Sequence, residues 1–178
     1  MTAEEVYDSV TNGGASDFAA AVAIFERFGP WCLIGGLAVN CYAEAVYTVD
    51  ANFVVVAREL AQVRRALADA GFSLQAFPHS VNAQRAGSDL SLQITTDQRY
   101  QDFPARAERR DVLGVTIPVA ALYDLIRGKI WAWQDADRRL TKRKKDELDL
   151  LRLAEAHPAV RASLPTEIVE QLEPENEK

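Results

Sequence analysis

The sequence is poor in cysteine, histidine and methionine, and these scarcities argue against several classes of site. Its 178 residues include two cysteines, two histidines and one methionine. Cys32 and Cys41 lie in apolar surroundings without CxxC spacing, which argues against a disulfide framework or a zinc site and predicts two reduced core residues. His79 and His157 have no partner pattern around them, so neither a histidine metal site nor a catalytic triad is expected.

Excess positive charge and long apolar runs are lacking as well. Lysine and arginine number 20 against 26 aspartates and glutamates, for a net charge of −6, which argues against bulk DNA or RNA binding. No apolar run approaches the ~20 residues that a membrane-spanning helix needs. The acidic N-terminal stretch does not have the layout of a signal peptide. We therefore expect a cytoplasmic protein without a membrane partner.

The hydrophobic pattern predicts helices alternating with strands, followed by a helical C-terminal third. Ser16 or Asp17 can cap a first helix that ends at Gly29-Pro30. After it we expect a strand at residues 31–34, a helix at 37–45, a strand at 51–57 and a helix at 58–70. Four more strands are expected at residues 72–77, 80–86, 88–96 and 111–119. The last should be an edge strand, because Pro118 cannot donate to a ladder.

The later strands are too closely spaced for helical crossovers, so the expected fold class is α/β (α+β), with a mixed sheet flanked by helices. We expect an α/β core at residues 1–118, a helical region at 119–172 packed on that core, and a disordered tail at 173–178. Residues 95–110, "TTDQRYQDFPARAERR", combine arginine with aromatic residues. Such a mixture can stack on bases, but the pattern favours a short amphipathic helix that covers a sheet edge.

A glycine pair, Gly35-Gly36, follows the strand at residues 31–34, and Asp50 opens the next strand. Glycines at this place relieve a tight turn and allow close helix–sheet packing. They also leave backbone N–H groups bare at a helix start, where phosphate binds. The segment is not a Rossmann fingerprint, since "GGLAVN" lacks the third glycine, and it is not a P-loop, since no GK[ST] follows.

The joint spacing of the glycines and Asp50 resembles the nucleotidyltransferase superfamily, which has the polymerase-beta-like fold. Members similar to abortive-infection and type IV toxin–antitoxin nucleotidyltransferases read "IGGxAv…RxTxDiD". The residues that match this pattern are Ile34, Gly35, Gly36, Ala38, Thr48 and Asp50. The C-terminal region is also similar to that family, which has a lysine-bearing helix and then a Lys-Asp…Asp segment. Lys129, Lys145, Asp146 and Asp149 fall on these features.

The resemblance implies an activity and a set of site residues. The implied reaction transfers a nucleoside monophosphate from a nucleoside triphosphate to a protein or RNA acceptor, with Mg²⁺ as cofactor. The implied catalytic and metal-binding positions are Asp50, Asn52 and Asp89. The implied nucleotide-binding positions are Gly35, Gly36, Thr48, Lys129 and Lys145.

The sequence departs from the family pattern at the metal ligands. In two-metal catalysis, carboxylates hold the two cations that bridge the reacting oxygens. Residues i and i+2 of a strand share a face, so a second carboxylate would be needed two residues after Asp50. This position is occupied by Asn52. Asp89 is the nearby candidate for another carboxylate, whereas Ser91 and Gln93 are neutral. The alternative is therefore a catalytically degenerate module that binds a nucleotide or a protein, as in a toxin–antitoxin-like system.

The lysines of the C-terminal region leave two interpretations open. Lys142, Lys145, Asp146 and Asp149 share one helix face by their spacing. The pattern is typical of surface ion pairs, which stabilise a helix only slightly. It fits equally well a helix that directs a lysine at phosphate groups.

Overall fold

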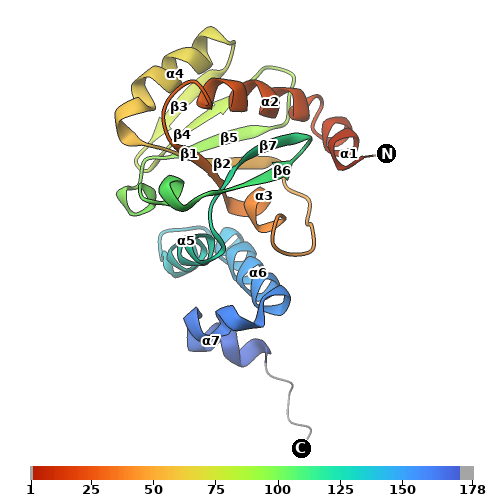
Figure 1. The fold of residues 1–178 in the computed structure, drawn as a ribbon, viewed down its shortest axis with the longest axis vertical. Helices are drawn as coiled ribbons and strands as arrows, with labels where there is room; N and C mark the ends of the chain where they lie inside the picture. Colours follow the sequence, from red (N-terminus) through yellow and green to blue (C-terminus); the bar gives the residue numbers. More distant parts are fainter. Residues whose placement is uncertain (1, 173–178) are drawn as a thin grey trace, which may run out of the picture.

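Seven short strands pair into one mixed sheet in the computed structural model, which describes residues 2–172 (Figure 1). The strands are β1 (Trp31–Ile34), β2 (Asp50–Val55), β3 (Ser73–Phe77), β4 (Ser80–Gln84), β5 (Ser91–Thr95), β6 (Glu108–Val112) and β7 (Val115–Val119). Their order across the sheet is β3-β4-β5-β2-β1-β7-β6. Because β2 runs antiparallel to β1 and parallel to β5, the prediction of a mixed sheet is confirmed.

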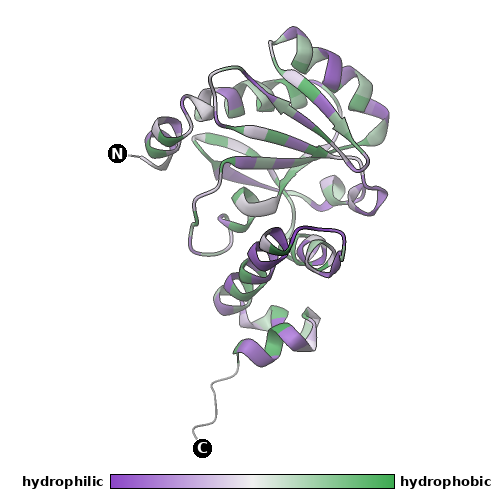
Figure 2. Cartoon of the chain, turned by 180° about the vertical axis from the view of Figure 1, so that it is seen from behind, coloured by the Kyte–Doolittle hydropathy of each residue, from purple (hydrophilic) through white to green (hydrophobic). Residues whose placement is uncertain are grey.

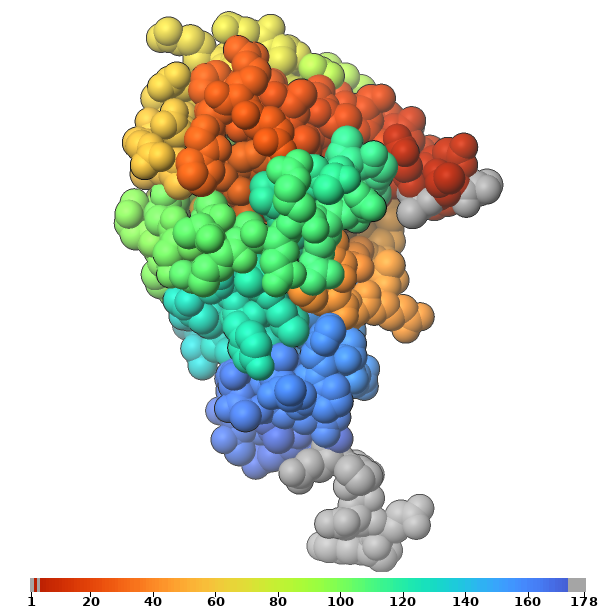
Figure 3. Space-filling view, in the orientation of Figure 1, coloured from red at the N-terminus to blue at the C-terminus, as the bar shows by residue number. Residues whose placement is uncertain are grey.

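Helices flank the sheet (Figure 1), and the C-terminal residues form a lobe beneath the α/β core (Figure 3). The α-helices are α1 (Ala3–Val10), α2 (Gly14–Phe25), α3 (Gly35–Val39), α4 (Leu60–Asp69), α5 (Leu122–Gln134), α6 (Leu140–Ala156) and α7 (Thr166–Val169). The 3₁₀ helices are η1 (Ala57–Glu59), η2 (Gln98–Tyr100), η3 (Phe103–Arg106), η4 (Pro158–Ser163) and η5 (Glu170–Leu172). The tail predicted at residues 173–178 lies outside the described residues. Between residues 2 and 172, no helix combines the length and the apolar character needed to cross a membrane.

One face of the sheet forms the main core against α2 and α4. Hydrophobic and hydrophilic residues alternate along the strands (Figure 2), so that Trp31 of β1 and Phe53 of β2 turn toward the same core. The ring centroid of Phe25 in α2 lies 5.3 Å from that of Trp31 and 4.8 Å from that of Phe53. Tilted aromatic pairs add about 0.5–1.5 kcal/mol each beyond the burial of their area. This packing fixes β1 and β2, whose opposite face carries the candidate site.

The opposite face is partly covered by η3 and α5. Phe103 of η3 is fully buried and packs with Cys32, Val54 and Ala120 in a smaller hydrophobic cluster. The prediction of an amphipathic helix that covers a sheet edge is therefore wrong in two respects. The segment forms 3₁₀ turns, and it lies on a face of the sheet. Pro104 at the start of η3 has no N–H to donate, which disfavours a continuous α-helix through this segment.

Residues 108–119 form a hairpin in place of a single edge strand. Leu113 (φ 48°) and Gly114 (φ 81°) connect β6 to β7, and two left-handed residues are the geometry of a tight hairpin turn. β7 lies between β1 and β6, so the prediction that Pro118 marks a sheet edge is wrong. The proline is accommodated because the pairing of β7 with β1 joins Val119 to Leu33, one residue beyond it.

The start of α2 differs from the sequence pattern. The helix begins at Gly14 behind Gly13 (φ 92°), without a side-chain cap, so neither Ser16 nor Asp17 has the capping role expected. Asp17 instead forms an ion pair with Arg85, whose Nη1 lies 2.7 Å from Asp17 Oδ1. The charge of Asp17 thus joins α2 to the end of β4.

Helix α3 is much shorter than the helix expected at residues 37–45. It ends at Val39, and the Asn40 side chain then exchanges hydrogen bonds of 2.8 and 3.0 Å with the backbone of Val46. A short amide side chain that bonds the backbone in this way competes with helix continuation. The chain therefore leaves the helix early and returns as a loop to the start of β2.

Candidate functional site

The glycine pair packs against β2, close to Asp50. Gly35 has a φ of +73°, and a Cβ atom there would lie 2.6 Å from Asn52 Nδ2 and 3.0 Å from Asn52 Cβ. A Cβ atom on Gly36 would make ordinary contacts with Thr48, the nearest at 3.5 Å. The antiparallel register that pairs Ile34 with Asn52 produces this approach. The structure thus brings Gly35, Gly36, Thr48 and Asn52 together around Asp50.

Neutral side chains surround Asp50 on this face of the sheet. In the parallel pair of β2 and β5, Asp50 lies opposite Ser91 and Asn52 lies opposite Gln93. On the other side of β5, Asn82 of β4 lies opposite Gln93. Residues in register across adjacent strands present their side chains to the same face. The positions beside Asp50 therefore carry amides and a hydroxyl in place of carboxylates.

Asp89 is held away from this row by the N-terminal segment. It is exposed and precedes the first residue of β5. Its Oδ2 accepts a hydrogen bond of 2.6 Å from Asn12 Nδ2, and its backbone N–H donates to the carbonyl of Thr11 at 2.9 Å. The carboxylate assigned as a third metal ligand thus has a partner of its own outside the sheet.

The donor set does not fit the two-metal magnesium site that the family resemblance implies. Mg²⁺ is bound through carboxylates and phosphates in near-octahedral oxygen geometry. Asp50 supplies one charge here, whereas Asn52 and Gln93 supply neutral amide oxygens. Within residues 2–172, no group of three or more histidine, cysteine, aspartate or glutamate residues is arranged to hold a metal ion.

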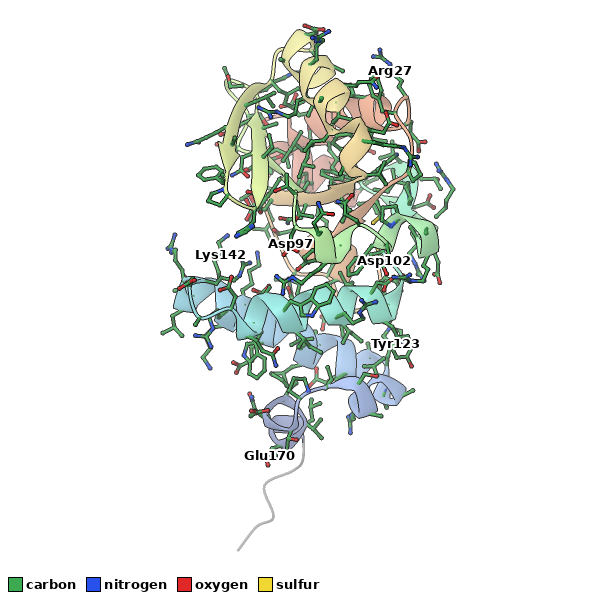
Figure 4. All side chains as sticks on the ribbon, turned by 90° about the vertical axis from the view of Figure 1, so that its left-hand side faces the viewer. Arg27, Asp97, Asp102, Tyr123, Lys142 and Glu170 are labelled. Carbon is green, nitrogen blue, oxygen red and sulfur yellow. The ribbon has the colours of Figure 1, made fainter. Side chains whose placement is uncertain are left out.

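Two lysines of α6 reach the start of β2, Lys142 at its first residue and Lys145 at a residue just before it. Lys142 Nζ lies 3.2 Å from Asp50 Oδ2, and Lys145 Nζ lies 3.3 Å from Thr48 Oγ1. The lysines are three residues apart on the helix, so their side chains are neighbours. Figure 4 shows Lys142 extending from α6 toward the core. The side chains of Lys142 and Asp50 remain 45% and 31% exposed, which leaves the pair open to a ligand.

Lys129, a predicted nucleotide-binding residue, lines the same cleft as Gly35 and Asn52 and is paired there with two aspartates of α6. Its buried Nζ lies 2.9 Å from Asp146 Oδ1 and 2.6 Å from Asp149 Oδ2. Arg138 contacts Asp146 at 2.8 Å and Arg152 contacts Asp149 at 2.7 Å. Each buried carboxylate therefore has two cationic partners, as a buried charge requires. These contacts join α5 to α6 and hold in place the helix that carries Lys142 and Lys145.

A cleft of about 930 Å³ opens beside the glycine pair, between the sheet and α5. Gly35, Asn52 and Gln93 line it on the sheet side. Tyr100 and Trp131 form part of the opposite wall, with ring centroids 5.2 Å apart in an edge-on arrangement. In Figure 4, Asp97 lies on the core side of the space between the core and the C-terminal helices. The volume is in the range of small-molecule sites.

The side chains at the cleft wall have distinct protonation states. Burial raises the pKa of Tyr100 to about 12, and its hydroxyl donates to the carbonyl of Gly128 at 3.1 Å. Arg99 hydrogen-bonds the Asp97 carboxylate, at 2.7 Å from Nη2 to Oδ2, and lowers the pKa of Asp97. The wall therefore presents a neutral phenol beside an ion pair at neutral pH.

The sequence does not reveal that Tyr100 and Trp131 form one wall. They belong to η2 and α5, far apart in the chain. The arginine-rich aromatic run at residues 95–110 was the signal that pointed to one half of the wall. Arg99 also lies over Trp131, with its guanidinium carbon 5.1 Å from the ring centroid.

No protein-family model matches the chain, and no curated protein matches it in sequence. Solved structures match it in fold. The structure of ANT(2″)-Ia in complex with adenylyl-2″-tobramycin is 14% identical, with a TM-score of 0.56 over 89% of this chain and 93% of that one. The solution structure of the antibiotic-resistance factor ANT(2″)-Ia is also 14% identical, with a TM-score of 0.54 over 89% and 88%.

A third match is a candidate nucleotidyltransferase from H. pylori. It is 20% identical to this chain, with a TM-score of 0.50 over 89% of this chain and 73% of the other. These likenesses span most of each chain at low identity. The protein therefore has a nucleotidyltransferase fold, as the spacing of the glycine pair and Asp50 indicated.

Proposed function

We propose that the protein binds a nucleoside triphosphate in the cleft beside β2, and that it does so without two-metal nucleotidyl transfer. The observation that carries this proposal is the replacement of carboxylates by Asn52 and Gln93 next to Asp50. Two-metal transfer needs carboxylates that hold both cations. The glycine pair and the lysines beside it still suit phosphate binding, because backbone N–H groups and ammonium groups bind phosphate without a metal ion.

The proposed site has one part that binds the phosphates and another that binds the base. Lys142, Lys145 and the backbone at Gly36 lie around Asp50 and Thr48 and would receive the phosphates. Tyr100 and Trp131 offer aromatic surface for the base in the adjoining cleft, which Gly35 and Asn52 also line. The fold neighbour that contains adenylyl-2″-tobramycin makes an adenine nucleotide the first ligand to test.

Transfer of a nucleoside monophosphate to a protein or RNA acceptor is the second candidate. It is favoured by Asp50, which is partly exposed and stands between the glycine pair and the lysines. This reading requires Mg²⁺-dependent incorporation of label from an α-labelled nucleoside triphosphate. Loss of that incorporation in Asp50→Ala, with Asp89→Ala unchanged, would establish transfer and overturn our proposal.

The test measures binding and transfer on the same preparation. We expect ATP to bind wild-type protein in calorimetry and to quench tryptophan fluorescence, because Trp131 lines the cleft. We expect no label on the chain or on added RNA. The Asn52→Asp/Gln93→Asp variant restores two carboxylates, and a gain of Mg²⁺-dependent labelling would locate the defect in these amides. Absence of binding by any nucleoside triphosphate would refute the proposed function.

A further inference from the structure

The charges beside Asp50 suit an anion better than a metal cation. Asp50 is the carboxylate at this end of β2, and it faces the ammonium group of Lys142 at 3.2 Å. Lys145 adds a second ammonium at Thr48, 3.3 Å from its hydroxyl. These three side chains together carry a net positive charge of one. A dication placed beside Asp50 would meet Lys142 at close range and be repelled by it.

We infer that Lys142 takes the position of a divalent cation beside Asp50. Its ammonium neutralises the carboxylate and, together with Lys145, receives the phosphates of a nucleoside triphosphate without Mg²⁺. The inference rests on the proposed function and adds to it the identity of the group that balances the ligand's charge. It makes Lys142 the residue that sets the metal requirement of the site.

The hydrogen-bonding capacity of the lysines supports this role. A lysine ammonium has three donors. Among the described residues, Lys142 donates to Asp50 and Lys145 donates to Thr48. Each ammonium thus keeps N–H groups that can turn to phosphate oxygens. Lys142 is 45% exposed, so a ligand reaches it without displacing buried structure.

The support of α6 directs both lysines at β2. Asp146 and Asp149 lie on the same helix face as the lysines. Their side chains are buried against α5, each only 3% exposed. Lys129 bridges the two carboxylates. A helix held in this way presents Lys142 and Lys145 in a fixed arrangement, which reduces the entropy lost when they bind a ligand.

The simpler interpretation is an exposed ion pair with no further role. Such pairs contribute little, because water and salt screen them. It predicts that removal of Lys142 leaves nucleotide binding unchanged. Lys144 provides the matched control on the same helix, because its Nζ contacts Glu147 at 3.1 Å and its side chain is 65% exposed.

The experiment titrates the full chain with ATP by calorimetry, once in excess EDTA and once in excess Mg²⁺. We expect wild-type affinity in EDTA to equal or exceed that in Mg²⁺. Lys142→Ala should lower the affinity in EDTA roughly ten- to a hundredfold, as expected when hydrogen bonds to a charged group are lost. Mg²⁺ should recover part of that loss, since Asp50 is then free, whereas Lys144→Ala should match wild type. A wild-type requirement for Mg²⁺, or unchanged binding by Lys142→Ala, would overturn the inference.

A second measurement separates this inference from the proposed function. Mn²⁺ alone is titrated against wild type and Lys142→Ala, with electron paramagnetic resonance reporting the free ion. We expect Lys142→Ala to bind Mn²⁺ roughly tenfold more tightly than wild type, because the repelling charge is gone. If no nucleotide binds under any condition, the proposed function fails, and the Mn²⁺ comparison still decides whether Lys142 holds the cation position. Equal Mn²⁺ binding by the two proteins would show that it does not.

Discussion

Replacing Gly35 with alanine tests the close approach of the glycine pair to β2. The residue has a φ of +73°, and its Cβ would come within 2.6 Å of Asn52 Nδ2 and 3.0 Å of Asn52 Cβ. The amide end of Asn52 can turn away, but its Cβ is fixed by the strand. Gly36 is the matched control, because a Cβ there meets Thr48 at an ordinary 3.5 Å.

The magnitude follows from two contributions. A left-handed alanine costs about 1–2 kcal/mol, and overpacking against a fixed neighbour costs about 1–3 kcal/mol. Reduced freedom of the unfolded chain offsets about 0.4–1 kcal/mol of this. Gly35→Ala should therefore lower the free energy of unfolding by about 3 kcal/mol, or the Tm by about 6–12 °C for a chain of this size. Gly36→Ala should be neutral or stabilising by up to about 1 kcal/mol.

Urea unfolding followed by tryptophan fluorescence measures both variants. A cycle with Asn52→Gly separates the contributions: removing that side chain should recover the overpacking share, about 1–3 kcal/mol, and leave the backbone strain. The reasoning fails if Gly35→Ala and Gly36→Ala unfold at the same urea concentration. It also fails if Asn52→Gly recovers none of the loss.

Two further predictions concern buried groups around the cleft. Lys129→Met should lower the free energy of unfolding by about 3 kcal/mol, because it removes the cation shared by Asp146 and Asp149. Urea unfolding measures this change, with Lys144→Met at an exposed position as the control. An equal effect of the two variants would contradict the prediction. Since the pKa of Tyr100 is raised from 10.0 to about 12 in the folded protein, its contribution to stability should be complete below pH 10 and be lost as the pH rises toward 12. Phenolate absorbance in wild type and Tyr100→Phe reports this titration, and ionisation of Tyr100 near pH 10 in the folded protein would contradict the burial argument.

Much of the sheet could be predicted because its central strands, β1 and β2, are short apolar runs. The local sequence pattern predicts β2 from its β-branched run, and it predicts helix ends from the glycines that follow them. The hairpin of β6 and β7 was not, because Leu113 adopts a left-handed conformation that leucine rarely takes. The early end of α3 was hidden for a similar reason, since it depends on Asn40 meeting the backbone of Val46.

The candidate site was predictable where it follows strand register and unpredictable where it depends on tertiary contacts. The i, i+2 rule placed Asp50 and Asn52 on one face and made the loss of a carboxylate visible. Asp89 could not be placed, because it is bonded to Asn12, which lies 77 residues earlier in the chain. Lys129 and Lys142 both lie in the helical region, and the sequence does not show that Lys129 is buried whereas Lys142 reaches Asp50.

A single face of α6 carries both the lysines that touch β2 and the aspartates that grip α5. Any rotation or sliding of that helix disturbs both sets of contacts together. The lobe and the strand are thus energetically tied, and thermodynamic reciprocity applies to them. For any ligand of the lobe that shifts α6, the factor by which it changes the affinity for the proposed nucleotide would equal the factor by which the nucleotide changes the affinity for that ligand.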